Sequence, residues 1–211
     1  MCFSTTASFA SFTVLSAVGV AGIKYAKQPA QKYFAAIPFL FATQQLTEAL
    51  VWIGLLQNTY WKTWPIHLFI FFAQVVWAVW VPLSILKLET QSKRIVALKA
   101  FLYLGIFLAA YTSYCMLFYH TSAVITNFHI NYKLYYPHQY YAVLTLLYLI
   151  PIIAPPLVSS IKEVRWIGIL LFVSFLITEI LFSDEVISVW CFFAAIISSI
   201  VYVVLKKLSH V

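Results

Sequence analysis

The sequence predicts an all-α membrane protein, a bundle of seven transmembrane helices that forms a single domain over residues 1–211. The composition is the first observation behind this prediction. Of the residues, 64% are hydrophobic and only 9% are charged, whereas roughly a quarter are charged in soluble domains. Second, seven apolar stretches fill almost the whole chain, each close to the roughly 20 residues that a helix needs to cross a bilayer. Third, the basic residues between the stretches lie mostly on one side.

The first apolar stretch, residues 5–26, has the length of a signal peptide. No basic residue precedes it, and its positive charges, Lys24 and Lys27, come at its end and after it. A signal peptide has its basic residues before the apolar run. We therefore expect a retained first helix whose amino end lies outside.

The remaining helices are expected, in order, at residues 34–56, 65–88, 95–118, 138–158, 164–183 and 185–205. Turn-forming or charged residues separate the seven helices: Gln28-Pro29, Gln57-Asn58 with Trp64-Pro65, Gln91-Ser92-Lys93-Arg94, Tyr136-Pro137, Lys162-Glu163 and Ser183-Asp184. The connection at Ser183-Asp184 is the shortest of those between predicted helices. A single helix over residues 164–205 would be about 63 Å long, however, about twice the thickness of the hydrocarbon core, so two helices are expected there.

The distribution of lysine and arginine predicts the orientation. Of the thirteen basic residues, all but Lys62 and Lys133 lie in the first, third and fifth connections, at the adjoining helix ends, and in the tail: Lys24, Lys27, Lys32, Lys87, Lys93, Arg94, Lys99, Lys162, Arg165, Lys206 and Lys207. The positive-inside rule places this side in the cytoplasm. The amino terminus is then outside and the carboxyl terminus inside. Anionic lipid headgroups account for the net charge of +7, so no nucleic-acid partner is expected.

On this topology the unusual polar residues fall in the outer half of the bundle. All three cysteines and both intramembrane glutamates lie there, and so do four of the five histidines: Cys2, Cys115, Cys191, Glu48, Glu179, His67, His120, His129 and His138. A site near the outer face is therefore the place to look for chemistry.

Glu48 is the strongest single signal, because an ionised carboxylate in hydrocarbon costs at least a few kcal/mol. Gln45, Glu48 and Trp52 recur at i, i+3 and i+7, so they form one polar stripe in which Gln45 and Trp52 are expected to contact a cofactor or ligand beside the carboxylate. Two interpretations are open. Glu48 is a general base, metal ligand or ion-binding group, or it is a protonated glutamate that only stabilises helix packing.

Cys2 and His129 are further candidates with open alternatives. If the initiator methionine is removed, Cys2 presents a thiol and an α-amine together, which suits a nucleophile or a metal ligand; a disulfide or simple packing is the alternative for the cysteines. His129 lies in a long tyrosine-rich connection, residues 119–137, of the size that serves as a lid or binding element. It is either a metal ligand or acid–base group, or an interfacial residue.

The sequence lacks the motifs of several common classes of enzyme and cofactor protein. The last helix has no lysine between Val186 and Leu205, which disfavours a retinal Schiff base. The chain has no HExxH, CxxC, CxxCH, Walker or GxSxG motif. Zinc proteases, covalent haem c proteins, P-loop nucleotide hydrolases and α/β-hydrolases are therefore disfavoured.

Five segments carry a resemblance to a known family: Met1-Cys2-Phe3-Ser4, residues 37–52 with Gln45 and Glu48, Trp77-Ala78-Val79-Trp80-Val81-Pro82, His129-Ile130 with Tyr132, and Ser188 to Ala195 with its Trp-Cys-Phe-Phe-Ala run. Together they resemble an uncharacterised family of bacterial multi-pass membrane proteins, a domain of unknown function whose members open Met-Cys-Phe-Ser. The resemblance implies that Cys2, Gln45, Glu48, His129 and Cys191 belong to the family pattern, and it implies no activity. Cys115 and Glu179 lie outside that pattern.

The leading functional hypothesis is a metal- or cofactor-binding centre near the outer face, built from Cys2, Glu48, His129 and Cys191. These ligands suit a transition metal, either zinc, copper or iron. Glu48 and Cys2 would be catalytic candidates for metal-assisted hydrolysis of a lipid or amide, so the sequence leaves open whether the protein is an enzyme. One alternative is a seven-helix receptor, sensor or small-molecule transporter, and another is a structural or assembly protein. The expected location is the plasma (inner) membrane, and the expected partners are membrane lipids and a small-molecule or lipid ligand.

Overall fold

The structure is a computed structural model that describes residues 4–126, 128–137 and 141–209. Six of its helical segments are long and apolar enough to cross a membrane: Thr5–Tyr25, Pro29–Leu56, Tyr60–Leu88, Ser92–Phe118, Lys162–Leu181 and Val186–Leu208. A seventh, Val143–Val158, is apolar but shorter. The predicted number of helices is confirmed, and the chain has the helix lengths and hydropathy of a membrane protein.

Several of the long segments contain breaks. The second segment consists of α2 (Pro29–Ala35) and α3 (Ile37–Leu56), and the last consists of α9 (Val186–Ser198) and α10 (Ile200–Leu208). The third is made of η1 (Tyr60–Lys62), α4 (Thr63–Phe71), the π-helical turn η2 (Phe72–Val76) and α5 (Trp77–Leu88). The remaining helices are α1 (Thr5–Tyr25), α6 (Ser92–Phe118), α7 (Tyr141–Val158) and α8 (Lys162–Leu181). The second segment begins earlier than expected, at Pro29. Proline suits the first helical turn because its missing N–H needs no partner there, and a capping box between Gln28 and Gln31 supports that end.

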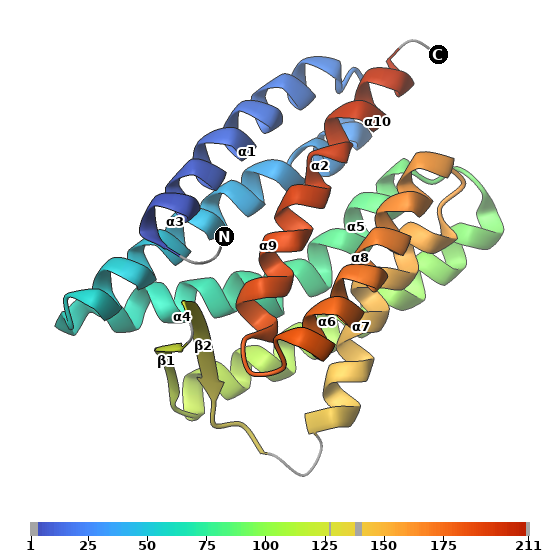
Figure 1. Cartoon of the computed structure of the whole chain (residues 1–211). Helices are drawn as coiled ribbons and strands as arrows, with labels where there is room; N and C mark the ends of the chain where they lie inside the picture. Colours follow the sequence, from blue (N-terminus) through green and yellow to red (C-terminus); the bar gives the residue numbers. More distant parts are fainter. Residues whose placement is uncertain (1–3, 127, 138–140, 210–211) are drawn as a thin grey trace.

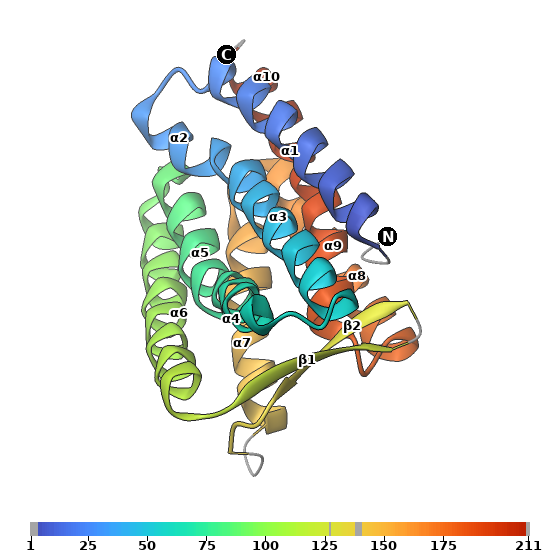
Figure 2. The same cartoon turned by 90° about the vertical axis from the view of Figure 1, so that its left-hand side faces the viewer.

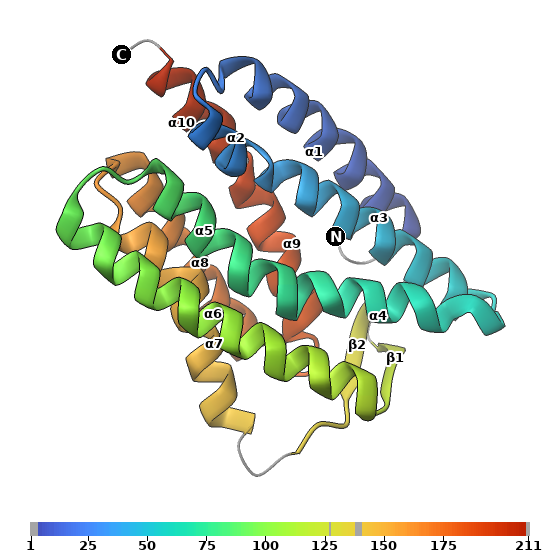
Figure 3. The ribbon, with the colours of Figure 1, turned by 180° about the vertical axis from the view of Figure 1, so that it is seen from behind.

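The buried helix α3 lies at the centre of one half of the bundle, against α1, α4 and α9 (Figures 1 and 2). The α5, α6, α7 and α8 helices form the other half, and α9 joins the halves by packing on both α3 and α8 (Figure 3). The α5 and α6 helices approach so closely that Gly105 lies directly against the carbonyl of Ala78. The α9 helix packs on α3, and Trp77 of α5 stacks on Phe41 of α3, so all three helices border the molecular interior.

The connections α1–α2, α5–α6 and α7–α8 and the carboxyl terminus meet at one end of the bundle, which we call the basic end (Figure 1). Lys27 donates to the carbonyl of Ser209 at 2.5 Å, and Lys207 pairs with Glu163. Arg94 donates to the carbonyl of Val158 at 2.8 Å, which ties α6 to the end of α7. The basic residues grouped by sequence thus share one end.

A β-hairpin lies across the opposite end, which we call the hairpin end (Figure 2). The prediction of an all-α fold with a loop over residues 119–137 is wrong here, because β1 (Thr121–Thr126) pairs antiparallel with β2 (His129–Leu134). Threonine, valine and isoleucine in these strands favour extended structure. Phe128, in the turn, adopts the left-handed region at φ 64°.

The hairpin is stabilised by packing onto the helices, since an isolated pair of strands is marginal at best. Ile130 is fully buried, and the ring of Tyr132 stacks on Phe69 of α4 with centroids 4.6 Å apart. Both residues belong to an apolar cluster that also contains Val51 of α3 and Cys191 of α9. The hairpin is therefore packed against the helices and covers the interior at this end of the bundle.

Candidate functional site

Glu48 lies on α3 in the interior, with no exposed surface. Ser188 of α9 donates its hydroxyl to Glu48 Oε1 at 2.6 Å, and Gln45 donates its amide to Oε2 at 3.3 Å. Burial of a carboxyl group is tolerated when such hydrogen bonds compensate for lost hydration. The glutamate is thus a fixed interhelical group and not a surface residue that reaches toward the headgroups.

One turn earlier on α3, Gln44 joins three helices. Its Oε1 accepts the indole N–H of Trp77 on α5 at 2.7 Å, and its Nε2 donates to the sulfur of Cys191 on α9 at 3.2 Å. Ser188 and Cys191 are three residues apart on α9, so they share a face and meet Glu48 and Gln44 in turn. We call Gln44, Gln45, Glu48, Ser188 and Cys191 the α3–α9 polar cluster.

Further buried polar atoms on α3 and α1 have no hydrogen-bond partner among the described residues. They are Oε1 of Gln45, Nε1 of Trp52 and the hydroxyl of Ser8 on α1. Each residue is at most 3% exposed. Buried polar atoms of this kind are usually satisfied by an internal water or a ligand.

The proposed metal ligands are placed as follows. Cys2 lies outside the described residues. His129 is on β2, where its ring packs 5.0 Å from that of Phe182. Glu48 and Cys191 hydrogen-bond to side chains of the polar cluster. Within the described part of the chain, no group of three or more His, Cys, Asp or Glu residues is arranged to hold a metal ion.

The other sequence candidates divide between core and surface. Cys115 and Cys191 are buried free thiols, so no disulfide joins them. Cys115 is a buried residue of α6. Glu179 is exposed near the end of α8 and contributes to the rim of the cavity described next. Of the two cysteines in the described part of the chain, Cys191 is the one that belongs to the α3–α9 polar cluster, through its hydrogen bond from Gln44.

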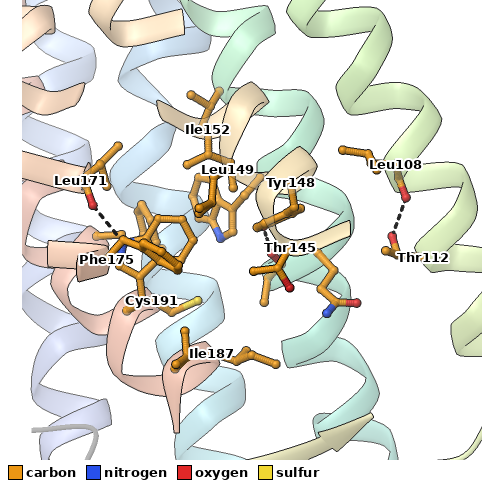
Figure 4. A pocket seen from close by; sticks show the side chains of 18 of the residues that line it. Leu108, Thr112, Thr145, Tyr148, Leu149, Ile152, Leu171, Phe175, Ile187 and Cys191 are labelled. Carbon is orange, nitrogen blue, oxygen red and sulfur yellow. Dashed lines mark hydrogen bonds between the residues drawn. The ribbon is translucent and has the colours of Figure 1, made fainter. Parts of the chain in front are cut away.

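A cavity of about 240 Å³ adjoins the polar cluster and runs between α5, α7, α8 and α9. Its walls are mainly apolar, including Trp77 and Ile85 on α5, Ile152 on α7 and Phe175 on α8. Figure 4 shows Cys191 and Phe175 on one side of the space, facing Thr145 and Tyr148 on the other. Because Cys191 lines the cavity and accepts from Gln44, the cavity and the polar cluster share one residue.

The π-helical turn η2 forms part of the cavity wall. Ala73 and Gln74 in this turn both line the space, and the hydroxyl of Tyr148 donates to the carbonyl of Ala73. A π-turn releases backbone groups from regular pairing and is frequent at functional sites. Oε1 of Gln74 is buried and has no hydrogen-bond partner in the part of the chain that the structure describes.

The sequence interpretation missed Gln74 and Tyr148 as site residues. Gln74 carried a usable signal, because it is the lone amide in an apolar run from Leu68 to Leu83, and an isolated polar side chain at that depth indicates a functional or packing partner. Tyr148 carried none, because tyrosine is common in membrane helices near the interface.

Comparison with known proteins identifies a family. A family model described as "Family of unknown function (DUF6629)" matches residues 1–210, so the chain belongs to that family. No curated protein and no solved structure matches the chain.

Proposed function

We propose that this member of a family of unknown function is a multi-pass membrane protein that binds a small lipophilic molecule in the cavity between α5, α7, α8 and α9. The single observation that carries this proposal is the apolar cavity of about 240 Å³ in the interior. The role is that of a receptor, sensor or carrier for such a molecule.

The size of the cavity supports a specific ligand. An apolar cavity of about 150 Å³ is sufficient for benzene, and pockets for drug-sized molecules begin at about 300 Å³. The present cavity lies between these values, so a ligand of roughly ten non-hydrogen atoms fits by proportion. Its walls offer apolar contact over most of their length, which favours a molecule that partitions into lipid.

The membrane orientation is part of the proposal. The hydrogen bonds at the basic end gather the basic residues on one side, which supports a cytoplasmic basic end and an outer hairpin end in a plasma membrane. The α3–α9 polar cluster, which includes Cys191, would then lie toward the outer face.

A transition-metal centre that includes Cys2 stays a second prediction, because Glu48, His129 and Cys191 alone form no described metal group. Elemental analysis of purified protein tests it. A stoichiometric metal that is lost in Cys2→Ser would support the centre, and its absence from the native protein would remove it.

The cavity proposal is tested by the quenching of tryptophan fluorescence by 1-bromodecane in lipid nanodiscs. Trp77 and Trp190 line the cavity, so bound bromodecane should add a saturable component to the linear quenching that arises from the bilayer. Ala194→Phe, which fills the cavity from α9, should remove the saturable component. Ile196→Phe, on the lipid-facing side of the same helix at 53% exposure, should retain it. Saturable quenching unchanged in Ala194→Phe would contradict the proposal.

A further inference from the structure

We infer that the ligand of this cavity is a single-chain amphiphile with an uncharged hydroxyl head, held by Gln74 and Tyr136 at the hairpin end while its chain extends toward the basic end. This inference rests on the proposed function and specifies its substrate class. The structure supports it through the polarity of the cavity, two buried polar atoms and the length of the cavity.

The cavity is polar at one end and apolar at the other. Six of its hydrogen-bonding side chains lie toward the hairpin end: Gln74, Tyr111, Thr112, Tyr136, Thr145 and Tyr148. Ser198, which lines the cavity nearer the basic end, already donates its hydroxyl to the carbonyl of Ala195. The contact of Gly105 with Ala78 sets the antiparallel register of α5 and α6, and it puts Tyr111 and Thr112 within about one helical turn of the level of Gln74. Toward the basic end the walls are Phe34, Ile85, Ile152, Ile167 and Val201. An amphiphile therefore has one preferred direction in this space.

Two atoms at the polar end are buried without a hydrogen-bond partner among the described residues. They are Oε1 of Gln74, which can only accept, and the hydroxyl of Tyr136, which can donate. Burial raises the pKa of Tyr136 above its ordinary value, so the residue remains a neutral phenol. A ligand hydroxyl would donate to Gln74 and accept from Tyr136, so both orphan atoms would be satisfied at once.

The charge of the lining argues against an ionic head. No lysine, arginine or histidine lines the cavity within the described part of the chain, so a carboxylate or phosphate head would be buried without a cation, which is costly. The one acidic residue, Glu179, is exposed at the rim. An uncharged head fits the polar end best.

The length of the cavity favours a chain over a compact ring system. Residues from Ala73 to Ile85 line one wall, which corresponds to about 18 Å of helix rise. A volume of about 240 Å³ over that length gives a mean cross-section of roughly 13 Å². Such a space has room for no more than one hydrocarbon chain.

The experiment compares 10-bromodecan-1-ol with 1-bromodecane and 10-bromodecan-1-amine, by saturable tryptophan quenching of the full-length protein in nanodiscs. The affinity of each probe is corrected for its partition into protein-free nanodiscs. We expect the wild-type protein to bind the alcohol roughly three- to tenfold more tightly than the alkane, the range that one or two neutral hydrogen bonds contribute. The amine should bind less tightly than the alcohol.

Two variants each remove one hydrogen-bonding atom. Gln74→Leu removes the acceptor and Tyr136→Phe removes the donor, and each should abolish most of the preference for alcohol over alkane while retaining saturable alkane binding. Gln57→Leu and Tyr103→Phe are matched controls at exposed positions, and they should retain the preference. Because Gln74→Leu removes a buried unsatisfied polar atom, its thermal stability should not fall.

The outcomes separate the two proposals. Saturable binding of alkane and alcohol with equal affinity would overturn the inference and leave the cavity proposal standing, and so would tighter binding of the amine. An alcohol preference that persists in both Gln74→Leu and Tyr136→Phe would also overturn the inference. No saturable binding of any probe by the wild-type protein would overturn the proposed function itself.

Discussion

At the scale of single residues, Gln44 of the polar cluster ties α3 to two other helices, because it bonds to both Trp77 on α5 and Cys191 on α9. Gln44→Leu leaves the indole N–H of Trp77 buried without its acceptor. We expect a loss of about 1–3 kcal/mol in the free energy of unfolding. The double variant Gln44→Leu with Trp77→Phe should lose less unfolding free energy than the sum of the two single losses, because the unpaired indole N–H is then absent.

Thermal unfolding in detergent micelles measures this cycle, with Thr43→Val on the exposed side of α3 as a control. Strictly additive effects of the two changes would show that Gln44 and Trp77 do not act as a pair.

Glu48 gives a second prediction at this scale. Glu48→Gln keeps an oxygen that can accept from Ser188, but it replaces Oε2 with an amide that cannot accept from Gln45. The variant should therefore fold with a modest stability loss of about 1 kcal/mol. Glu48→Ala should lower the free energy of unfolding several times more, because it leaves a cavity and removes the acceptor of the Ser188 hydroxyl. Equal unfolding temperatures for the two variants would contradict this.

The sequence predicted part of this site. A carboxylate at i and an amide at i−3 in an apolar helix indicated a buried polar stripe, and Glu48 is indeed buried. Gln74, Tyr136 and Tyr148 escaped prediction because their convergence depends on a π-turn and on a hairpin packed under the bundle. Neither has a signature in residue spacing.

At the scale of secondary-structure elements, the close contact between α5 and α6 gives a sharp prediction. A Cβ on Gly105 would overlap the backbone carbonyl of Ala78, whereas a Cβ on Gly22 would lie 3.5 Å from Leu205 Cδ1, an ordinary contact. Gly105→Ala should therefore lower the unfolding temperature clearly, since two helices must separate. Gly22→Ala should leave it unchanged or raise it, because alanine favours helix by up to about 1 kcal/mol. The opposite order in a thermal scan would refute the packing of α5 on α6.

Helices were easier to predict than the hairpin for a physical reason. Crossing a bilayer requires about 20 apolar residues in helical form, so hydropathy alone indicates helix number. Strands such as β1 and β2 obtain their stability from contacts with Phe69 and Cys191, which are remote in sequence. Local composition at residues 121–134 is therefore compatible with a loop.

At the scale of the whole molecule, Glu89 ties the α5–α6 connection to the α7–α8 connection. Its Oε1 accepts from the N–H groups of Thr90 and Gln91 at 3.0 Å, and its Oε2 accepts from that of Ser160 at 2.8 Å. Burial raises the pKa of Glu89, but the hydrogen bonds from Gln91, Ser160 and Thr90 together outweigh it and hold the pKa below its ordinary value.

A lowered carboxyl pKa has a definite consequence for stability. The contribution of Glu89 is complete above the ordinary value of 4.5 and is lost as the pH falls through the lower pKa of the folded state. The unfolding temperature of the wild-type protein should therefore fall more steeply below about pH 4.5 than that of Glu89→Gln. Glu163→Gln, which breaks the exposed pair with Lys207, should keep nearly the wild-type profile. Identical acid profiles for Glu89→Gln and wild type would contradict the role of Glu89.

Orientation is also a property of the whole molecule. A carboxyl-terminal alkaline phosphatase fusion should be inactive, and a carboxyl-terminal green fluorescent protein fusion should be bright, because the basic end is expected in the cytoplasm. Phosphatase activity from that terminus would invert the topology and place the hairpin end inside.

The π-turn at Phe72–Val76 also makes the cavity depend on chain length. A π-turn holds one residue more than an α-turn, and one residue corresponds to about 100° of rotation about the helix axis. Because the π-turn absorbs this extra residue locally, deleting one residue of the turn would restore a regular helix and leave the faces before and after it nearly in register. The side chains inside the turn, Gln74 among them, would shift relative to those faces. A relative shorter by one residue in this turn is therefore expected to have a rearranged polar end of the cavity, although almost every side chain would still be present.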